Sequence, residues 1–180
     1  MSGKYTDLGI CVFDAVSAKE TLRRLTLTLI GSNTSMATME SCTGGALASY
    51  ITDTEGASTV FKGAIVAYTN LSKELTGIPS ETIERFGVYS PETALKMAIR
   101  CREAFKAEVG AGVTGSFSNP DPANADSVPG EVYFALSNGA GDECFKCQLP
   151  LLNDRAEYKL CVSGCIAGQL LRRLGAEDRV

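Results

Sequence analysis

Histidine is missing from the 180 residues of this chain. Its absence excludes Ser-His-Asp and Cys-His catalysis, histidine metal ligands and histidine general bases. Acid–base chemistry near neutral pH therefore has to use lysine, tyrosine, cysteine or a carboxylate.

An excess of positive charge is also missing, as are long apolar runs. The net charge is −4 and the pI is about 5.0, so the chain lacks the broad basic surface that binds a nucleic-acid backbone. Apolar stretches such as 64–67 and 161–171 are too short to span a membrane, and residues 1–8 contain no apolar signal region. We therefore expect a cytoplasmic protein with no nucleic-acid or membrane partner.

Disulfide and metal patterns are weak, although seven cysteines are present. An odd number of cysteines spread along the chain is typical of free, mostly buried thiols in a reducing compartment. Cys144 and Cys147 form a CxxC pair, but no second pair has matching spacing, and residues three apart on a strand face opposite sides. We expect no disulfide framework, no metal ion and no organic cofactor.

The composition is that of a globular protein, with 44% hydrophobic and 21% charged residues. The length and the lack of a linker or repeat predict a single domain over residues 1–180.

Helix and strand patterns alternate along most of the chain. The Ser17–Glu20 capping box precedes Leu22, Leu25 and Leu29 at helical spacing, and Ser90 with Pro91 starts another amphipathic helix. The pattern predicts a mixed sheet covered by helices on both faces. Three helices are expected to start at Ser17, Ser90 and Asn153, and three shorter ones to cover 46–52, 71–77 and 80–86. The expected strands cover 35–40, 60–68, 108–114, 131–137 and 143–149. A long loop is expected over 115–130.

The turn Ser41–Gly45 lies between an expected strand and an expected helix. Its two glycines, Gly44 and Gly45, can bring backbone N–H groups to a phosphate or an oxyanion, but the spacing fits a purely structural turn equally well. Ser41 is a candidate nucleophile that requires a base other than histidine. Lys73 can be that base if it is desolvated, whereas the alternative is a solvated lysine on a short helix.

Other polar residues have functional and structural interpretations. Thr114 and Gly115 end a strand where α/β sheets place ligand contacts, and Arg155 can grip a phosphate or form a surface salt bridge. Asp121, Asp126 and Glu131 are candidates for a cation site, but they lack a recognised metal-loop spacing, so we expect them to be solvated loop charges. Arg172 and Arg173 are expected to lie on a solvated face.

Several motifs occur together in a fixed order. They are Glu40-Ser-Cys-Thr-Gly-Gly45, Gly56-Ala-Ser, Phe61-Lys-Gly63, Val66-Ala-Tyr68 with Asn70 and Lys73, Val88 with Ser90, Val113-Thr-Gly115, Pro129-Gly130 with Val132-Tyr133, and Asp154-Arg155. Together they resemble the CinA C-terminal-domain family of competence/damage-inducible, nicotinamide-nucleotide amidohydrolase-like proteins. The resemblance covers about residues 16–174 and implies a three-layer α/β/α sandwich with a mixed, mostly parallel central sheet, often in a homo-oligomer.

The resemblance implies a hydrolase of NAD salvage that converts nicotinamide mononucleotide, a pyridine nucleotide, to nicotinic acid mononucleotide and ammonia. Carried over by motif, Ser41 is the nucleophile, Lys73 accepts and donates the proton, and Tyr68 orients them. The implied substrate contacts are Cys42, Thr43, Gly44, Gly45, Asn70, Thr114, Gly115 and Arg155.

Two positions depart from the family pattern. Ser116–Pro122 replaces a loop richer in glycine, and Lys159 stands where a second arginine often follows Arg155. A catalytically inactive nucleotide-binding module and an amidase for another small amide therefore remain as alternatives. The chain is expected to be a stand-alone form without the N-terminal nucleotide-processing domain of longer family members.

Overall fold

One mixed sheet runs through the part of the chain described by this computed structural model, residues 4–139 and 141–176. The strand order is β1-β6-β5-β4-β2-β3. Pairs β1/β6, β2/β3 and β2/β4 are parallel, whereas β4/β5 and β5/β6 are antiparallel. The expected mixed, mostly parallel sheet is confirmed. The strands are β1 (Thr6–Ile10), β2 (Met36–Glu40), β3 (Phe61–Val66), β4 (Val109–Gly115), β5 (Glu131–Ser137) and β6 (Asp142–Gln148).

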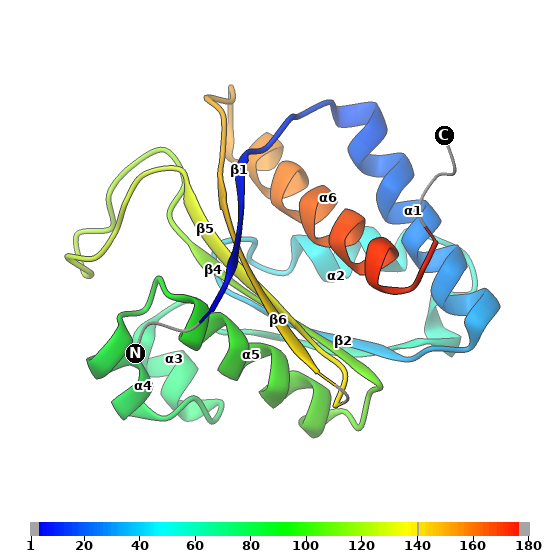
Figure 1. Cartoon of the computed structure of the whole chain (residues 1–180), viewed down its shortest axis with the longest axis horizontal. Coiled ribbons are helices and arrows are strands. Elements are labelled where there is room, and N and C mark those ends of the chain that lie inside the picture. The colour runs from blue at the N-terminus through cyan, green and yellow to red at the C-terminus, as the bar shows by residue number, and fades with distance from the viewer. Residues whose placement is uncertain (1–3, 140, 177–180) are drawn as a thin grey trace.

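Helices cover both faces of the sheet, which confirms the three-layer architecture (Figure 1). One layer contains α1 (Ala15–Ser32), α2 (Ala46–Thr52) and α6 (Arg155–Arg173), and the other contains α3 (Asn70–Leu75), α4 (Ser80–Phe86) and α5 (Pro91–Ala104). A short 3₁₀ helix spans Ala57–Thr59. None of the described helices is long and apolar enough to cross a bilayer.

Two predicted helix starts were wrong. Asp14, not Ser17, caps α1, because its carboxylate accepts the Ser17 backbone N–H at 2.7 Å. Asp154, not Asn153, caps α6 in the same way, accepting the Glu157 N–H at 2.9 Å. In both cases the capping residue is an aspartate, and it accepts the backbone N–H of the residue three positions later in the chain.

Strand β1 was missed by the sequence analysis. It is short, four of its five residues are exposed, and its pairing with β6 shifts register between Asp7 and Ile10. Such an edge strand carries no alternation of apolar and polar residues for a pattern to detect.

Glycines on β4 allow α5 to lie very close to the sheet. A Cβ atom at Gly112 would lie 2.2 Å from the Ala94 carbonyl oxygen, and one at Gly110 would lie 2.1 Å from that of Ala98. Only glycine fits at these two positions, so this helix is held directly against the strand that ends beside the candidate site.

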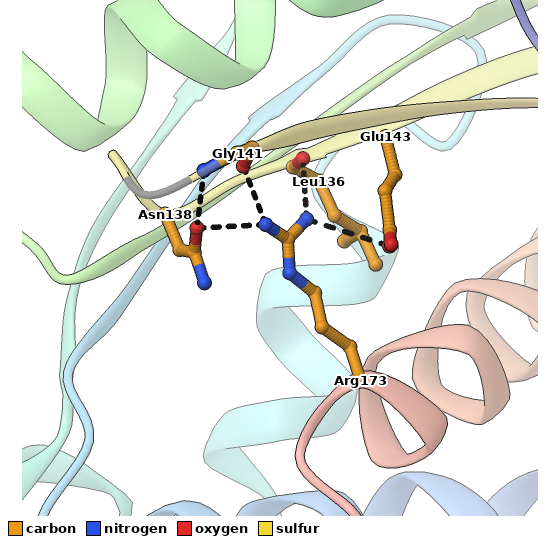
Figure 2. A network of polar contacts seen from close by, with 5 residues as sticks. All are labelled: Leu136, Asn138, Gly141, Glu143 and Arg173. Carbon is orange, nitrogen blue, oxygen red and sulfur yellow. Dashed lines mark hydrogen bonds and ion pairs between the residues drawn. The ribbon is translucent and has the colours of Figure 1, made fainter.

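Arg173 joins the end of α6 to the β5–β6 hairpin (Figure 2). Its guanidinium donates to the Leu136 carbonyl at 2.9 Å, to Asn138 Oδ1 at 2.7 Å and to the Gly141 carbonyl. Glu143 completes the network at 3.5 Å. The expectation that Arg173 is solvated was therefore wrong, because the hairpin offers its guanidinium several acceptors at once.

Candidate active site

The candidate site lies where β2 and β4 end side by side. Ser41 directly follows β2, and its backbone N–H donates to the Val113 carbonyl of β4 at 3.0 Å. Lys73 comes from α3, which follows β3 on the other side of β2. Ligand sites of open α/β sheets form at the carboxyl ends of parallel strands, as here.

Ser41 and Lys73 are in direct contact. Lys73 Nζ donates to Ser41 Oγ at 3.0 Å, and the two residues are only 1% and 5% exposed, respectively. Burial lowers the pKa of Lys73 to about 8, against the opposing effects of Cys42 and Asp121. Lys73 is therefore not the solvated lysine of the alternative interpretation, and part of its population is neutral near physiological pH.

The start of α2 is filled by the carboxylate of Glu40. Its oxygens accept the backbone N–H groups of Gly45 at 3.0 Å, Leu47 at 3.1 Å and Ala48 at 2.8 Å. The Gly44 N–H donates to the Ser41 carbonyl at 3.0 Å. The N–H groups of Gly44 and Gly45 thus already have acceptors within the protein, which favours the structural turn over an anion site at these two glycines. Their positive φ angles, 60° and 92°, explain the glycines structurally.

The backbone N–H groups of Cys42 and Thr43 are different. Within the described residues, neither donates to a backbone or side-chain oxygen, and both face the Cys42 sulfur, which is only a weak acceptor. Both follow Ser41 directly, which is where an oxyanion formed at Ser41 would need donors. Burial raises the pKa of the Cys42 thiol to about 12, so Cys42 itself is a protonated, unreactive neighbour. The Thr43 hydroxyl is buried without a partner among the described residues.

A cavity of about 240 Å³ opens at Ser41. Its wall comes from the loop after β4, and two aromatic residues that the sequence analysis did not single out, Tyr89 and Phe117, also line it. This volume lies just below the roughly 300–1,000 Å³ of typical small-molecule sites. The full lining is Ser41, Cys42, Tyr68, Tyr89, Gly115, Ser116, Phe117, Asn119, Pro120, Asp121 and Arg155.

Arg155 and Tyr68 form one side of the cavity. Arg155 Nη2 donates to the Tyr68 hydroxyl at 3.1 Å, and its guanidinium lies 5.1 Å from the centre of the Phe117 ring. Tyr68 therefore meets Arg155 rather than the Ser41–Lys73 pair that it was expected to orient. Phe117 in turn stacks on Tyr158 of α6 at 5.3 Å, which fixes the wall against that helix.

Asp121 is tied to Tyr89 on the opposite side. The Tyr89 hydroxyl donates to Asp121 Oδ2 at 2.6 Å, and Asn124 Nδ2 donates to the same oxygen at 2.6 Å. These hydrogen bonds, with that of Tyr89 the largest cause, lower the pKa of Asp121. The expectation that Asp121 is a solvated loop charge was wrong. Glu131 is likewise paired, with Lys146 at 2.5 Å, and Asp126 accepts the Tyr89 backbone N–H at 3.1 Å.

Two of the predicted substrate contacts have structural partners instead. Asn70 Nδ2 donates to Asn124 Oδ1 at 2.7 Å, and the buried Thr114 hydroxyl donates to the Val88 carbonyl at 3.0 Å. Gly115 does line the cavity. Lys159, in the position that departs from the family pattern, lies beside the glycine turn, because a Cβ atom at Gly44 would be 3.5 Å from its Nζ.

Comparisons with known proteins agree on one family. The model of the CinA C-terminal domain matches residues 18–170. A CinA-like protein of Desulfovibrio desulfuricans is 43% identical over 104 residues, which are 57% of this chain and 24% of that protein. The matched segments cover only 24% to 32% of the first curated relatives, so this chain spans about a quarter to a third of their length.

Solved structures show the same architecture. The competence/damage inducible protein CihA of Agrobacterium tumefaciens superposes with a TM-score of 0.78 at 28% identity, over 88% of this chain and 96% of that one. A competence-damaged protein (CinA) superfamily protein of Enterobacter cloacae gives 0.77 at 25% identity, over 97% and 98% of the two chains.

Proposed function

This chain belongs to the CinA C-terminal domain family, and we propose that it is an amidohydrolase that deamidates nicotinamide mononucleotide to nicotinic acid mononucleotide and ammonia. The observation that carries the proposal is the buried contact of 3.0 Å between Lys73 Nζ and Ser41 Oγ. A serine becomes a nucleophile when an adjacent base takes its proton, and a desolvated lysine with a pKa of about 8 is such a base.

The proposed reaction has two halves. Neutral Lys73 accepts the Ser41 proton while Ser41 Oγ attacks the carboxamide carbon. The N–H groups of Cys42 and Thr43 stabilise the resulting oxyanion. Protonated Lys73 then gives its proton to the departing nitrogen, which leaves as ammonia, and an acyl-serine remains. Water attacks this ester with Lys73 again as base, Lys73 returns that proton to the departing Ser41 Oγ, and the carboxylic acid is released.

The cavity lining supports a substrate with charges of both signs. A pyridine mononucleotide carries a cationic ring and an anionic phosphate. The Asp121 carboxylate and the aromatic rings of Tyr89 and Phe117 suit the ring, because cations bind favourably to carboxylates and aromatic faces. Arg155 at the edge of the cavity suits the phosphate.

One observation favours an amidase for a different small amide. The cavity wall includes Ser116, Phe117, Asn119, Pro120 and Asp121, which belong to the loop where this chain departs from the family pattern. A changed wall changes substrate preference before it changes the chemistry at Ser41. A nucleotide-binding module without turnover is the remaining alternative.

An ammonia-release assay separates these functions. We expect the wild-type chain to release ammonia from nicotinamide mononucleotide, and Ser41→Ala to bind the substrate with turnover reduced by about 10⁴-fold or more. Thr54→Ala, an exchange at a small hydroxyl residue outside the site, is the matched control and should keep turnover. Ammonia from nicotinamide or another small amide alone would favour the second function, and binding without ammonia in both wild type and Ser41→Ala would favour the binding module.

We also propose that the chain forms a cytoplasmic homo-oligomer. The edge of the sheet at β3 and the following helix expose apolar side chains, including Leu71 and Leu75, which are 63% and 78% exposed. Apolar side chains gathered at one edge are typical of contact surfaces. Light scattering coupled to gel filtration tests this, since a monomer at all concentrations would reject it.

A further inference from the structure

Four of the seven cysteines converge between the sheet and α6. The sulfur atoms of Cys11, Cys161 and Cys165 all lie within 4.8 Å of one another, and those of Cys11 and Cys165 are 2.8 Å apart. Cys147 is buried in the same core cluster and precedes Gln148, whose carbonyl accepts the Cys11 backbone N–H at 2.8 Å. We call these four residues the thiol cluster. It lies outside the cavity at Ser41 and takes no part in the proposed reaction.

The fold brings the thiol cluster together from three separate elements. Cys11 follows β1, and its backbone N–H donates to the Gln148 carbonyl at 2.8 Å, which places it beside Cys147 at the end of β6. Cys161 and Cys165 are one turn apart on α6 and therefore share a helix face. All four positions belong to regular elements or directly adjoin one, so the sulfur atoms are held by the backbone.

We propose that the thiol cluster is a structural zinc site, in which Cys11, Cys161 and Cys165 are ligands and Cys147 is the fourth. A Zn–S bond of about 2.3 Å in a tetrahedral site puts two sulfur ligands roughly 3.8 Å apart. The sulfur atoms of Cys11, Cys161 and Cys165, all within 4.8 Å of one another, lie close to that spacing. Each thiol gives up its proton on binding, so uptake of one Zn²⁺ by four thiols releases four protons.

The number of converging thiols favours a metal ion over the other uses of cysteine. A disulfide consumes two sulfur atoms, whereas three lie within mutual reach here and a fourth cysteine, Cys147, is buried in the same core cluster. Packing of cysteines as small apolar side chains does not require their sulfur atoms to lie close together. Soft thiolate ligands select zinc and similar ions.

A zinc ion would have both a route into the thiol cluster and a role there. A surface cavity of about 290 Å³ is lined by Cys161 and Cys165 together with Asp14 and Ser17 of the α1 start. The bound ion would fasten β1 and β6 to α6, which would stabilise an edge strand that is otherwise held by one neighbour. The sequence analysis expected no metal, because among the cysteines it weighed only Cys144 and Cys147 as a possible metal-binding pair.

Metal analysis of the purified full chain tests the proposal. Wild-type protein should bind one Zn²⁺ per chain in competition with a chromophoric chelator, and Co²⁺ in its place should give the intense sulfur-to-metal charge-transfer band of a tetrahedral thiolate site. Cys165→Ser should weaken binding by more than the about 10–100-fold typical of changes outside the ligand set. Cys144→Ser is the matched control, because Cys144 is on the same strand as Cys147 but contacts Pro91, and it should bind zinc as the wild type does.

A second measurement guards against a variant that fails to fold. In the wild-type chain, zinc should protect four thiols from a thiol-specific reagent under native conditions and raise the melting temperature, and a chelator should reverse both effects. The proposal is overturned if the wild type takes up no zinc and its thiols stay free. It is equally overturned if intact mass shows a loss of two hydrogens and peptide mapping assigns a disulfide within the cluster. Equal zinc binding by Cys165→Ser and Cys144→Ser would also reject it.

Discussion

Glu40 and Lys73 are two buried ionisable side chains beside the same serine, and they differ in the number of their hydrogen-bond partners. Glu40 is 0% exposed and receives three backbone N–H groups as well as the Thr38 hydroxyl at 3.2 Å. Lys73 is 1% exposed, and its ammonium donates to the single hydroxyl of Ser41. A buried carboxyl group with a full set of donors has its hydrogen-bonding capacity satisfied, whereas a buried ammonium with few partners is pushed toward its neutral form.

This difference separates a structural charge from a reactive one. Glu40 fixes the start of α2 and so fixes the turn that carries Ser41. Burial lowers the pKa of Lys73 to about 8, so part of its population is neutral near physiological pH, and only the neutral amine can accept a proton. Substitutions of the two residues should therefore differ in effect: at Lys73 the activity should fall, and at Glu40 the stability should fall.

The largest effect is expected at Lys73. Lys73→Met and Lys73→Arg should each lower kcat by about 10²–10⁴-fold, because neither side chain can accept the Ser41 proton. Steady-state ammonia release measures this, with Lys62→Arg, on the exposed surface of β3, as the control for a conservative exchange. Near-normal turnover in Lys73→Arg would show that positive charge, not proton transfer, is what the site needs from this residue.

The next effect concerns the free energy of unfolding, which should change differently on substitution of Glu40 and of Lys73. Glu40→Gln leaves an amide group facing backbone N–H donors, so the free energy of unfolding should fall by about 2–3 kcal/mol. Lys73→Met replaces a desolvated amine with an apolar side chain and should leave the free energy of unfolding unchanged or raise it by about 1 kcal/mol. Urea denaturation at pH 7 measures both, with the exposed Glu55→Gln as control. A loss of stability in both variants would show that Lys73, like Glu40, stabilises the fold.

A smaller effect is expected at Arg155, which is exposed and lies at the edge of the cavity. Arg155→Met should raise KM for nicotinamide mononucleotide by about 10-fold and change kcat little, because a phosphate contact far from the carboxamide acts on binding. Arg155→Lys should recover part of the loss. The control is Arg23→Met on the exposed face of α1, and a fall in kcat without a change in KM would place Arg155 at the reacting carbon instead.

The remaining effect is the gradual dependence of kcat on pH. Since burial lowers the pKa of Lys73 to about 8, its reactive neutral form grows as the pH rises to that value. Values of kcat should therefore increase about tenfold per pH unit below pH 8 and level off above it. A rate independent of pH between 6 and 9 would contradict a lysine base. The same profile measured for Glu40→Gln should keep its midpoint if Glu40 acts only on the turn.

The sequence predicted the strands and helices that have clear periodicity, and it predicted the Ser41–Lys73 pair from the motif set. It could not reveal that Glu40 fills the start of α2, because a glutamate at the end of a buried strand has no pattern that shows where its carboxylate turns. Tyr89, Phe117 and Asp121 were missed for a related reason. Their place at the cavity depends on how a loop without periodicity folds back over the sheet.

The thiol cluster shows the same limit at longer range. Cys161 and Cys165 have a spacing that is visible in the sequence, but Cys11 and Cys147 join them only through the pairing of β1 with β6. Because β1 itself lacks a detectable pattern, no local reading could place Cys11 next to α6. The positions of Cys11 and Cys147 next to α6 therefore depend on long-range strand pairing.

The position of β1 at the edge of the sheet also imposes an order on folding during synthesis. Of the described strands, β1 is synthesised first, yet β6, its neighbour in the described sheet, is synthesised last. Strands β2, β3 and β4, which pair with one another and carry the Ser41 turn, can assemble well before that. In the meantime β1 is an unpaired strand that could join a neighbouring chain. The charges of Lys4 and Asp7 and the irregular register around Gly9 make it a poor template for such pairing, so the weakness of this strand protects the nascent chain from aggregation.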